Sequence, residues 1–396
     1  MEISILNKKV QEFINSNLGN NISKLALQKN PFPDMDYHVV LNQIASKSKA
    51  KEKLRTFFNS ENIIYPSKIS VEQTSSEKTA KYKSEIVFGE FLIDLTGGFG
   101  VDDLYFSKKI KNVIHCEINS ELSKIVAHNF ESLNIKNISC LNGDSKDILK
   151  TFELFSKQVF DWIYVDPSRR NDSKGKVFML EDCLPNVPEN LEFYFKYSKN
   201  ILIKTAPILD ISAGLLELIN VKTIHIVAVE NEVKELLWVI EKDFVEEIEI
   251  KTINITKKCE EKFYFVWNKN QEMPIFGMPK KYLFEPNASI MKSGGFNEVA
   301  IQFGLEKLHQ FSHLYTSDKK IVFSGRVFEI DICIQYNKIE MKKHFENQKA
   351  NITTRNFPET VEDIRKKFKI KDGGNRYCFF TTNANDEKIV LICTKI

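Results

Sequence analysis

The residues with the clearest potential for chemistry lie in a glycine-rich loop that follows an apolar run. Glycine has no Cβ and tolerates positive φ, so such a loop lets a ligand approach the backbone closely. In parallel sheets the ligand then lies at the carboxyl end of the strands, where the strand order reverses. The pattern lacks the third glycine of Gly-x-Gly-x-x-Gly, and an acid just before the loop suits a cationic amino-acid group better than a pyrophosphate. The candidate ligand-binding residues of this loop are Asp94, Thr96, Gly97, Gly98, Phe99 and Gly100.

Acidic residues recur at the ends of the next two apolar runs. Glu117 is placed to accept hydrogen bonds from both hydroxyls of a ribose, and Asp144 lies where an adenine edge would be. A single acid at a strand end is more often a loop or cap residue, but its recurrence at three successive strand ends favours a nucleoside-type ligand. The neighbouring candidate residues are Ile118, Gly143 and Ser145.

The fourth and fifth runs end in residues that could act on a second substrate. Asp166 begins the sequence Asp-Pro-Ser-Arg-Arg, in the position nearest the reacting group. Arg169 and Arg170 could hold a phosphate or pair with acids. Lys204 ends an apolar run, where burial is expected to lower its pKa and suit it to proton transfer. The alternative is a lysine that reaches solvent at the rim of the sheet.

Short apolar runs alternate with helical stretches between residues 86 and 268. The runs lie at 91–96, 112–118, 138–142, 160–166, 201–205, 223–230 and 236–241. Several are apolar on consecutive residues, which is typical of strands covered on both faces. The alternation predicts right-handed crossovers and a mostly parallel sheet. We therefore expect an α/β, Rossmann-like sheet of seven strands, with an antiparallel edge where a short turn joins the last two.

The flanking segments have other patterns. Residues 1–85 carry apolar positions at three- and four-residue spacing and predict an N-terminal helical region, in which Ser75 is expected to cap a helix. A linker rich in Pro and Gly begins at Met273 and precedes two small α+β domains. The expected domains are 1–85, 86–268, 274–318 and 319–396.

The composition argues against several classes of protein. The 396-residue chain has a net charge of +3 and no run of 18 apolar residues that could span a membrane. Its seven cysteines are far apart and form no Cys-x-x-Cys pair, which opposes a zinc ribbon or a disulfide framework. The N-terminus also lacks the pattern of a signal peptide. These features predict a cytoplasmic protein without a metal site.

Residues 91–166 resemble the class I S-adenosylmethionine-dependent methyltransferases in the order and spacing of the loop and the acids. More narrowly, nearly the whole chain is similar to a bacterial methyltransferase family with C-terminal ferredoxin-like and THUMP-like domains. The segments that carry this similarity are 72–83, 166–170, 204–210, 282–288, 355–358 and 371–377. The resemblance implies S-adenosylmethionine as the cofactor. Because THUMP domains bind RNA, it also implies an RNA methyltransferase that acts on tRNA or rRNA.

The residues after the fourth run bear on the methyl acceptor. Amino-group methylases carry Asn/Asp-Pro-Pro-Tyr at this place, but residues 166–169 read Asp-Pro-Ser-Arg, without the ring that stacks on a base. Ribose 2′-O methyltransferases of the heat-shock rRNA type use a Lys-Asp-Lys-Glu tetrad instead. This similarity implies Lys204 as the base, oriented by carboxylates. Ordinary charges at strand ends are the alternative. The matching residues are Lys81 or Lys83, Asp166, Lys204 and Glu235.

Two other functions stay open at this point. One is a base N-methyltransferase acting on RNA, and the other is a non-catalytic module that binds the cofactor or RNA. The acids at three strand ends oppose a module that has lost its chemistry, and the glycine pattern opposes a nicotinamide-dependent oxidoreductase. The sequence leaves the RNA, the methylated atom and the oligomeric state open.

Overall fold

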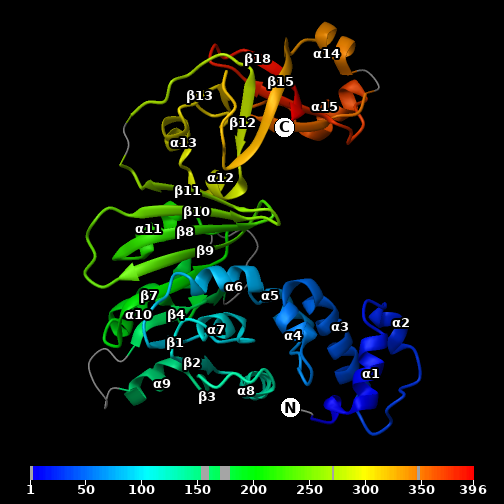
Figure 1. Ribbon diagram of the computed structural model, residues 1–396, viewed down its shortest axis with the longest axis vertical. Helices are drawn as coiled ribbons and strands as arrows, with labels where there is room; N and C mark the ends of the chain where they lie inside the picture. Colours follow the sequence, from blue (N-terminus) through cyan, green and yellow to red (C-terminus); the bar gives the residue numbers. More distant parts are fainter. Residues whose placement is uncertain (1–2, 153–159, 170–178, 270–271, 346–347) are drawn as a thin grey trace. The chain divides into compact units, whose positions relative to one another are not determined.

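The computed structural model describes residues 3–152, 160–169, 179–269, 272–345 and 348–396 (Figure 1). The chain divides into two compact units. The first comprises Met1–Thr223 and Glu235–Glu246, and the second comprises Ile224–Lys234 and Glu247–Ile396.

The first unit begins with short helices, as the apolar spacing predicted. Polar side chains start several of them; Asn7 and Asp36, for example, each accept a hydrogen bond from a backbone N–H of the first turn. Such caps satisfy donors that have no partner inside the helix. The helices are η1 (Ile3–Leu6), α1 (Lys8–Ser16), α2 (Ile22–Ala26), α3 (Tyr37–Lys53), α4 (Arg55–Asn59), α5 (Lys68–Gln73) and α6 (Glu77–Ser84).

Seven strands then form the predicted Rossmann-like sheet, in the order β8-β9-β7-β4-β1-β2-β3. Strand β1 pairs in parallel with β2 and β4, whereas β9 runs antiparallel to β7. The first unit contains residues 221–223 of β8 and 235–241 of β9. The strands are β1 (Phe91–Asp94), β2 (Asn112–Glu117), β3 (Ile138–Asn142), β4 (Phe160–Val165), β7 (Ser198–Thr205), β8 (Val221–Val229) and β9 (Glu232–Glu241). Each of the seven predicted runs is a strand, so the α/β fold class is confirmed.

Helices connect these strands, and they bring the carboxyl ends of the parallel strands to one edge of the sheet. A small antiparallel pair, β5 and β6, lies between β4 and α10 in the chain. These elements are α7 (Val101–Phe106), α8 (Ser120–Ser132), α9 (Ser145–Thr151), β5 (Ser168–Arg169), η3 (Leu180–Asp182), β6 (Cys183–Leu184), α10 (Val187–Tyr194) and α11 (Ile211–Glu217).

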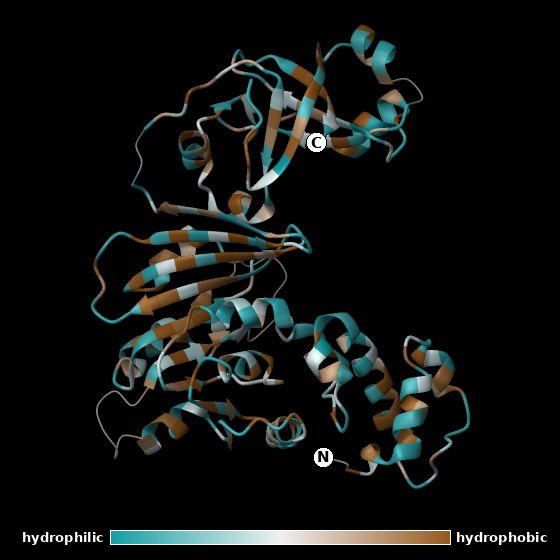
Figure 2. Ribbon diagram, in the orientation of Figure 1, coloured by the Kyte–Doolittle hydropathy of each residue, from teal (hydrophilic) through white to brown (hydrophobic). Residues whose placement is uncertain are grey.

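The central strands are buried on both faces, which explains why they are apolar on consecutive residues. Leu92, Ile93, Ile163 and Ile201 have no exposed surface. Figure 2 shows the same property as brown, hydrophobic stretches along β7 and β9. Burial of this apolar surface provides most of the free energy that holds the sheet in place, and it makes the strand ends a rigid base for polar side chains.

The N-terminal helices share a hydrophobic core with the sheet unit. Phe57 and Tyr65 pack against Phe99 of the glycine loop, with ring centroids 5.0 and 6.2 Å apart. Leu104 of α7 and Phe130 of α8 belong to the same buried cluster. The helical region therefore supports the loop from behind.

The second unit has its own seven-stranded sheet, in the order β13-β14-β12-β15-β18-β17-β16. The order of the other sheet also continues past β8 with β10 and β11, two strands beyond the seven predicted. The strands of this unit are β10 (Glu249–Ile255), β11 (Glu260–Val266), β12 (Tyr282–Pro286), β13 (Glu306–Lys307), β14 (Tyr315–Ser317), β15 (Gly325–Gln335), β16 (Asn351–Arg355), β17 (Arg376–Thr382) and β18 (Lys388–Lys395). Its helices are α12 (Ala288–Ser293), α13 (Phe296–Phe303), α14 (Lys338–Phe345) and α15 (Val361–Phe368).

Candidate active site

Hydrogen bonds connect the end of β1, the start of the glycine loop and the end of β4. Asp94 is buried, and its Oδ1 accepts hydrogen bonds from the backbone N–H of Thr96 (2.7 Å) and from the Thr96 hydroxyl (3.1 Å). The Oγ1 of Thr96 accepts a hydrogen bond from the backbone N–H of Asp166 (2.7 Å). The structure therefore brings these three predicted residues together at the carboxyl edge of the sheet.

Glycine is needed at positions 97 and 98 for two different structural reasons. A Cβ on Gly97 would overlap the imidazole ring of His115, so the loop rests directly on that ring. Gly98 has φ of +56°, a conformation that side chains disfavour, and a Cβ there would meet only the Thr96 carbonyl, at 3.7 Å. Gly98 thus leaves open space beside the backbone, which is what a ligand cradle requires.

The end of β2 places a carboxylate beside this open space. Oε2 of Glu117 accepts a hydrogen bond from the N–H of Gly98 (3.1 Å), and Oε1 accepts one from the N–H of Asn119 (2.7 Å). The next side chain, Ile118, is 72% exposed. A carboxylate next to an open apolar side chain fits the hydroxyls of a ribose and the flat face of a base.

The end of β3 adds the third predicted group. Gly143 donates its N–H to the carbonyl of Glu117 (3.2 Å). Asp144 is exposed and caps α9 by accepting a hydrogen bond from the N–H of Lys146 (2.8 Å), and Ser145 begins that helix. Asp144 therefore caps α9, and its role toward a ligand stays a prediction. Phe99, also predicted as a cofactor residue, directs its ring into the core cluster with Phe57 instead.

A buried acid and a buried histidine lie beneath the glycine loop. Nδ1 of His115 lies 2.6 Å from Oδ2 of Asp103, and both side chains are fully buried. Burial and the charge of Asp102 raise the pKa of Asp103 well above its ordinary value. Burial also raises the pKa of Asp94, together with the charge of Asp103, and burial lowers the pKa of His115. This cluster is stabilised when it carries little charge.

Lys204 and Asp166 form the ion pair at the ends of β7 and β4. Nζ of Lys204 donates a hydrogen bond to Oδ2 of Asp166. Burial alone would lower the pKa of Lys204, but the negative charges of Asp166, Glu235 and Asp102 outweigh it and raise the pKa above the ordinary lysine value. The sequence-based expectation of a lowered pKa is therefore wrong, because three carboxylates surround this amine.

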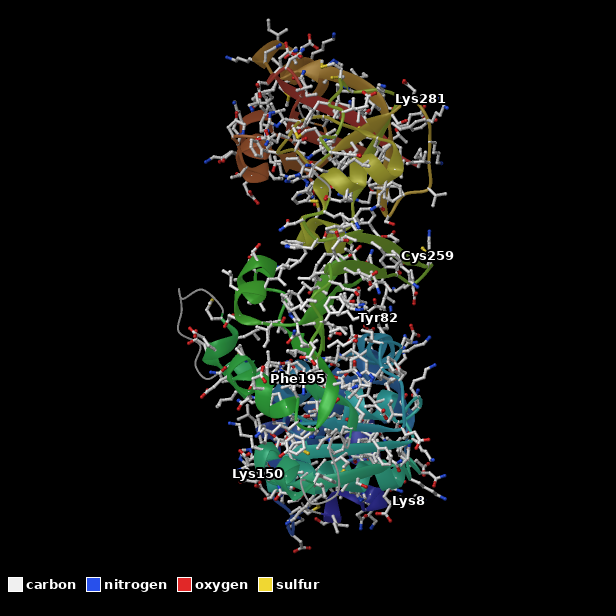
Figure 3. All side chains as sticks on the ribbon, turned by 90° about the vertical axis from the view of Figure 1, so that its left-hand side faces the viewer. Lys8, Tyr82, Lys150, Phe195, Cys259 and Lys281 are labelled. Carbon is white, nitrogen blue, oxygen red and sulfur yellow. The ribbon has the colours of Figure 1, made fainter. Side chains whose placement is uncertain are left out.

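Lys83 is the centre of a second, deeper group. Its Nζ donates hydrogen bonds to Oε1 and Oε2 of Glu235 (3.0 and 2.9 Å) and to Oγ of Ser75 (2.8 Å), and it lies 3.1 Å from Oδ1 of Asp102. Lys81, the other lysine that the tetrad allowed, is exposed. Tyr82, which is labelled in Figure 3, lies between the two lysines in the sequence of α6.

Three members of this group were not predicted as site residues. Oδ2 of Asp102 accepts hydrogen bonds from the hydroxyls of Ser75 and Tyr164, both at 2.8 Å. Ser75 was expected to cap α6, but the cap is Ser76, which accepts from the N–H of Thr79. That prediction is wrong by one residue, and Ser75 instead bridges Lys83 and Asp102. The adjacent acids at 102 and 103 in an otherwise apolar helix were the available signal.

The five charged side chains form a gradient from the interior to the solvent. The Lys83 side chain is 0% exposed and that of Glu235 2%. The side chains of Asp102, Lys204 and Asp166 are 11%, 13% and 35% exposed. Asp166 is the most exposed of the five, and Lys204 is its direct partner, so this pair is the part of the group that a substrate would meet first.

Of the two predicted arginines, the structure describes only the backbone of Arg169. The backbone of Arg169 pairs with Cys183 in the β5–β6 pair, and Arg170 lies outside the described residues. Among the described residues, no group of three or more His, Cys, Asp or Glu side chains could hold a metal ion. None of the helices in that part of the chain is long and apolar enough to cross a membrane.

Comparisons with known proteins agree with this architecture. Residues 282–323 match a ferredoxin-like domain family, and residues 325–395 match a family described as THUMP domain-like. A crystal structure of a candidate methyltransferase from Porphyromonas gingivalis W83 is 31% identical, covers 100% of this chain and 98% of its own, and has a TM-score of 0.88. The chain belongs to the same family. It is the class I S-adenosylmethionine-dependent methyltransferase family with C-terminal ferredoxin-like and THUMP-like domains.

More distant structures and curated proteins add little to this family assignment. An O-methyltransferase from Bacillus cereus, solved in complex with SAH, is 13% identical to this family member. It covers 61% of this chain and 100% of its own, with a TM-score of 0.35. No curated protein matches the chain.

Proposed function

We propose that the chain is an S-adenosylmethionine-dependent methyltransferase that acts on RNA, tRNA or rRNA, with a ribose 2′-hydroxyl as the acceptor. The observation that carries the proposal is the meeting of Lys83, Asp166, Lys204 and Glu235 beside the glycine loop. The THUMP domain-like match at residues 325–395 supports RNA as the substrate, because THUMP domains bind RNA.

The residues around the loop fit the cofactor. When bound, S-adenosylmethionine supplies an electrophilic methyl group on a positively charged sulfonium. The open side of Gly98 would lie along the amino-acid part, and the Glu117 carboxylate would accept the ribose hydroxyls. The exposed Ile118 side chain would cover one face of the adenine, and the exposed carboxylate of Asp144 would lie toward its edge. Asp94 holds Thr96 and thereby fixes the loop.

The outer ion pair then faces the acceptor. Methyl transfer needs an oxygen held about 3–3.5 Å from the methyl carbon and a group that takes the hydroxyl proton. Lys204 holds its own proton in this electrostatic setting, so it is an ammonium donor rather than the base that the tetrad comparison implied. In our proposal Asp166 accepts the proton, and the Lys204 ammonium orients both Asp166 and the acceptor oxygen.

Cofactor binding is tested separately from turnover. S-adenosylhomocysteine, and not NAD, is expected to raise the melting temperature of the protein. The change Lys204→Ala should leave the affinity for S-adenosylhomocysteine within about threefold and lower turnover at least about 100-fold, because the ammonium that orients Asp166 and the acceptor oxygen is lost. Lys199→Ala, an exposed lysine on the same strand, is the matched control and should retain turnover. Undiminished methylation by Lys204→Ala would remove Lys204 from the mechanism.

The substrate is tested with RNA from a strain that lacks the gene. Purified tRNA and rRNA fractions from that strain are incubated with the protein and methyl-labelled S-adenosylmethionine, and the nucleosides are analysed by mass spectrometry. We expect one new 2′-O-methylated nucleoside that is also missing from the deletion strain. A base-methylated nucleoside would replace the 2′-O proposal with base N-methylation, and labelling of neither RNA would overturn RNA as the substrate.

A further inference from the structure

Two arginines of the second unit share one buried glutamate, and the proposed reaction gives them no role. We propose that Arg326, Arg355 and the exposed Phe311 form a binding site for one single-stranded nucleotide of the RNA. The arginines would hold its phosphate, and the ring would stack on its base. The inference rests on RNA as the substrate in the proposed function, and it deepens that function by naming the residues of the second unit that would hold the RNA.

Glu285 holds the two guanidinium groups in place. Its Oε2 accepts a hydrogen bond from Nε of Arg326 (2.6 Å), and its Oε1 accepts one from Nη2 of Arg355 (3.0 Å). Glu285 on β12 and Arg326 on β15 are direct cross-strand partners, whereas Arg355 ends β16 at the edge of the same sheet. The Arg326 guanidinium also lies 5.5 Å from the ring centroid of Phe328. The Glu285 side chain is only 3% exposed, so a buried carboxylate sets the position of both arginines.

The two guanidinium groups keep donors for a further anion. One carboxylate beside two guanidinium cations leaves this group of three with an excess of one positive charge. The side chains of Arg326 and Arg355 are 37% and 33% exposed. No hydrogen bond joins Nη1 of either arginine to another residue that the structure describes, and the buried Nε of Arg355 also has no partner there. Since guanidinium N–H groups match phosphate oxygens in geometry and charge, a phosphate fits between them.

A histidine connects Phe311 to the end of β16. Nδ1 of His309 accepts hydrogen bonds from the side-chain amide of Asn356 (2.9 Å) and from the backbone N–H of Phe311 (3.1 Å). Since both groups are donors, the imidazole ring carries its hydrogen on Nε2 and donates it to Oδ1 of Asp386 (2.9 Å). Asn356 directly follows Arg355 in the chain. The turn that carries Phe311 is therefore held beside the arginine at the end of β16.

An exposed ring beside this pair of arginines favours a nucleotide over a free anion. Phe311 is 61% exposed. An unpaired RNA base can stack on such a ring, while arginines hold the neighbouring phosphate, whereas a base inside a duplex has no free face. Phe311 lies in the part of the chain that matches a ferredoxin-like domain, and both arginines lie in the THUMP domain-like part. The site therefore combines residues from the two C-terminal domains.

The test measures RNA binding by the full chain without turnover. Fluorescence anisotropy follows the binding of a labelled oligoadenylate of about ten nucleotides. In Arg355→Met we expect about tenfold weaker binding, and the slope of the logarithm of the binding constant against that of the salt concentration should become shallower by about 0.7, the value for one phosphate contact on a single strand. In Phe311→Ala we expect about tenfold weaker binding with an unchanged slope, because the stacking ring is lost and the phosphate contact is kept. Phe311→Trp should restore the affinity.

Two exposed residues of the same unit provide matched controls. Lys338→Met removes one positive charge from α14, and Tyr264→Ala removes an exposed ring from β11. Both should bind oligoadenylate like the wild type. Unchanged affinity in folded Arg355→Met overturns the proposal, as does unchanged affinity in Phe311→Ala. If Arg355→Met does not fold, Phe311→Ala decides alone, because an exposed ring contributes little to folding.

The same variants separate this site from the proposed function. Oligoadenylate binding needs neither S-adenosylmethionine nor methyl transfer. Binding that depends on Arg355 and Phe311, without methylation of any RNA fraction, would overturn the methylation of RNA and not the site. If both variants methylate an RNA fraction at the wild-type rate, at RNA concentrations below saturation, the site is overturned and the proposed function stands.

Discussion

Asp102 and Asp103 are neighbours on the first turn of α7, yet they belong to two regions with opposite electrostatics. Asp102 faces Lys83 and accepts hydrogen bonds from two hydroxyls, and the pKa of its carboxyl is lowered. Asp103 faces His115 beneath the glycine loop, with Asp94 nearby, and its pKa is raised well above the ordinary value. One region is an ion-pair network and the other is a cluster that avoids charge.

The difference teaches how the two halves of the site work. The Asp103 side supports the loop through packing and neutral hydrogen bonds, because the Gly97 backbone rests on the ring of His115. The Asp102 side is an ion-pair network, because Asp102 and Glu235 both lie beside the buried Lys83 amine. A buried ion pair is costly to break but is a poor source of net stability.

The largest effect is expected from removing the shared cation. The change Lys83→Met would leave Asp102 and Glu235 buried without a counterion, and breaking such a buried pair costs about 3–5 kcal/mol. We expect the free energy of unfolding in urea to fall by that amount. The matched control is Lys81→Met, an exposed lysine on the same helix, which should unfold like the wild type. A loss below about 1 kcal/mol would mean that the network is not a buried ionic one.

A smaller effect is expected from a change in the glycine loop, which rests on the Asp103–His115 cluster. In Gly97→Ala the new Cβ would overlap the His115 ring, so the loop must move, and overpacking of this kind costs about 1–3 kcal/mol. The affinity for S-adenosylhomocysteine, measured by titration calorimetry, should fall at least about tenfold. Ser139→Ala, on an exposed position of β3, is the control and should bind normally. Normal affinity in Gly97→Ala would separate the loop from the cofactor.

The smallest effect concerns pH and sharpens the contrast between the two acids. A carboxyl whose pKa is raised by folding stabilises the protein below its unfolded pKa, and this stability is lost as the pH rises through the folded pKa. Asp103→Asn removes that loss. Relative to the wild type, its free energy of unfolding should therefore improve by about 1 kcal/mol between pH 5 and pH 8. If the free energy of unfolding of Asp103→Asn rose relative to the wild type toward low pH instead, Asp103 would be stabilised as an anion, like Asp102.

Much of the fold could be predicted because its signals are local. Consecutive apolar residues marked seven of the nine strands of the first sheet, and the glycines marked the loop after β1. Glu117 could be placed beside the loop because parallel strands end at one edge. Strands β10 and β11 were missed, since their alternating polar residues give a weaker pattern than the buried runs.

The charged half of the site could be predicted only in part. Residue types and chain order pointed to Asp166, Lys204 and Glu235, and the structure brings them together with Lys83. Ser75 was misread as a cap because a serine before a helix has the same local pattern in both roles. Its actual partner, Asp102, is 27 residues away along the chain.

The sequence by itself determined the apolar strands, the glycine loop and the acids at the strand ends, because each depends on neighbours within a few residues. Only the tertiary structure decided which lysine of α6 is buried and which carboxylates surround Lys204. Lys83 meets Glu235 across 152 residues of chain. The protonation of a buried amine depends on the charges within a few ångströms, and those charges come from elements that only folding brings together.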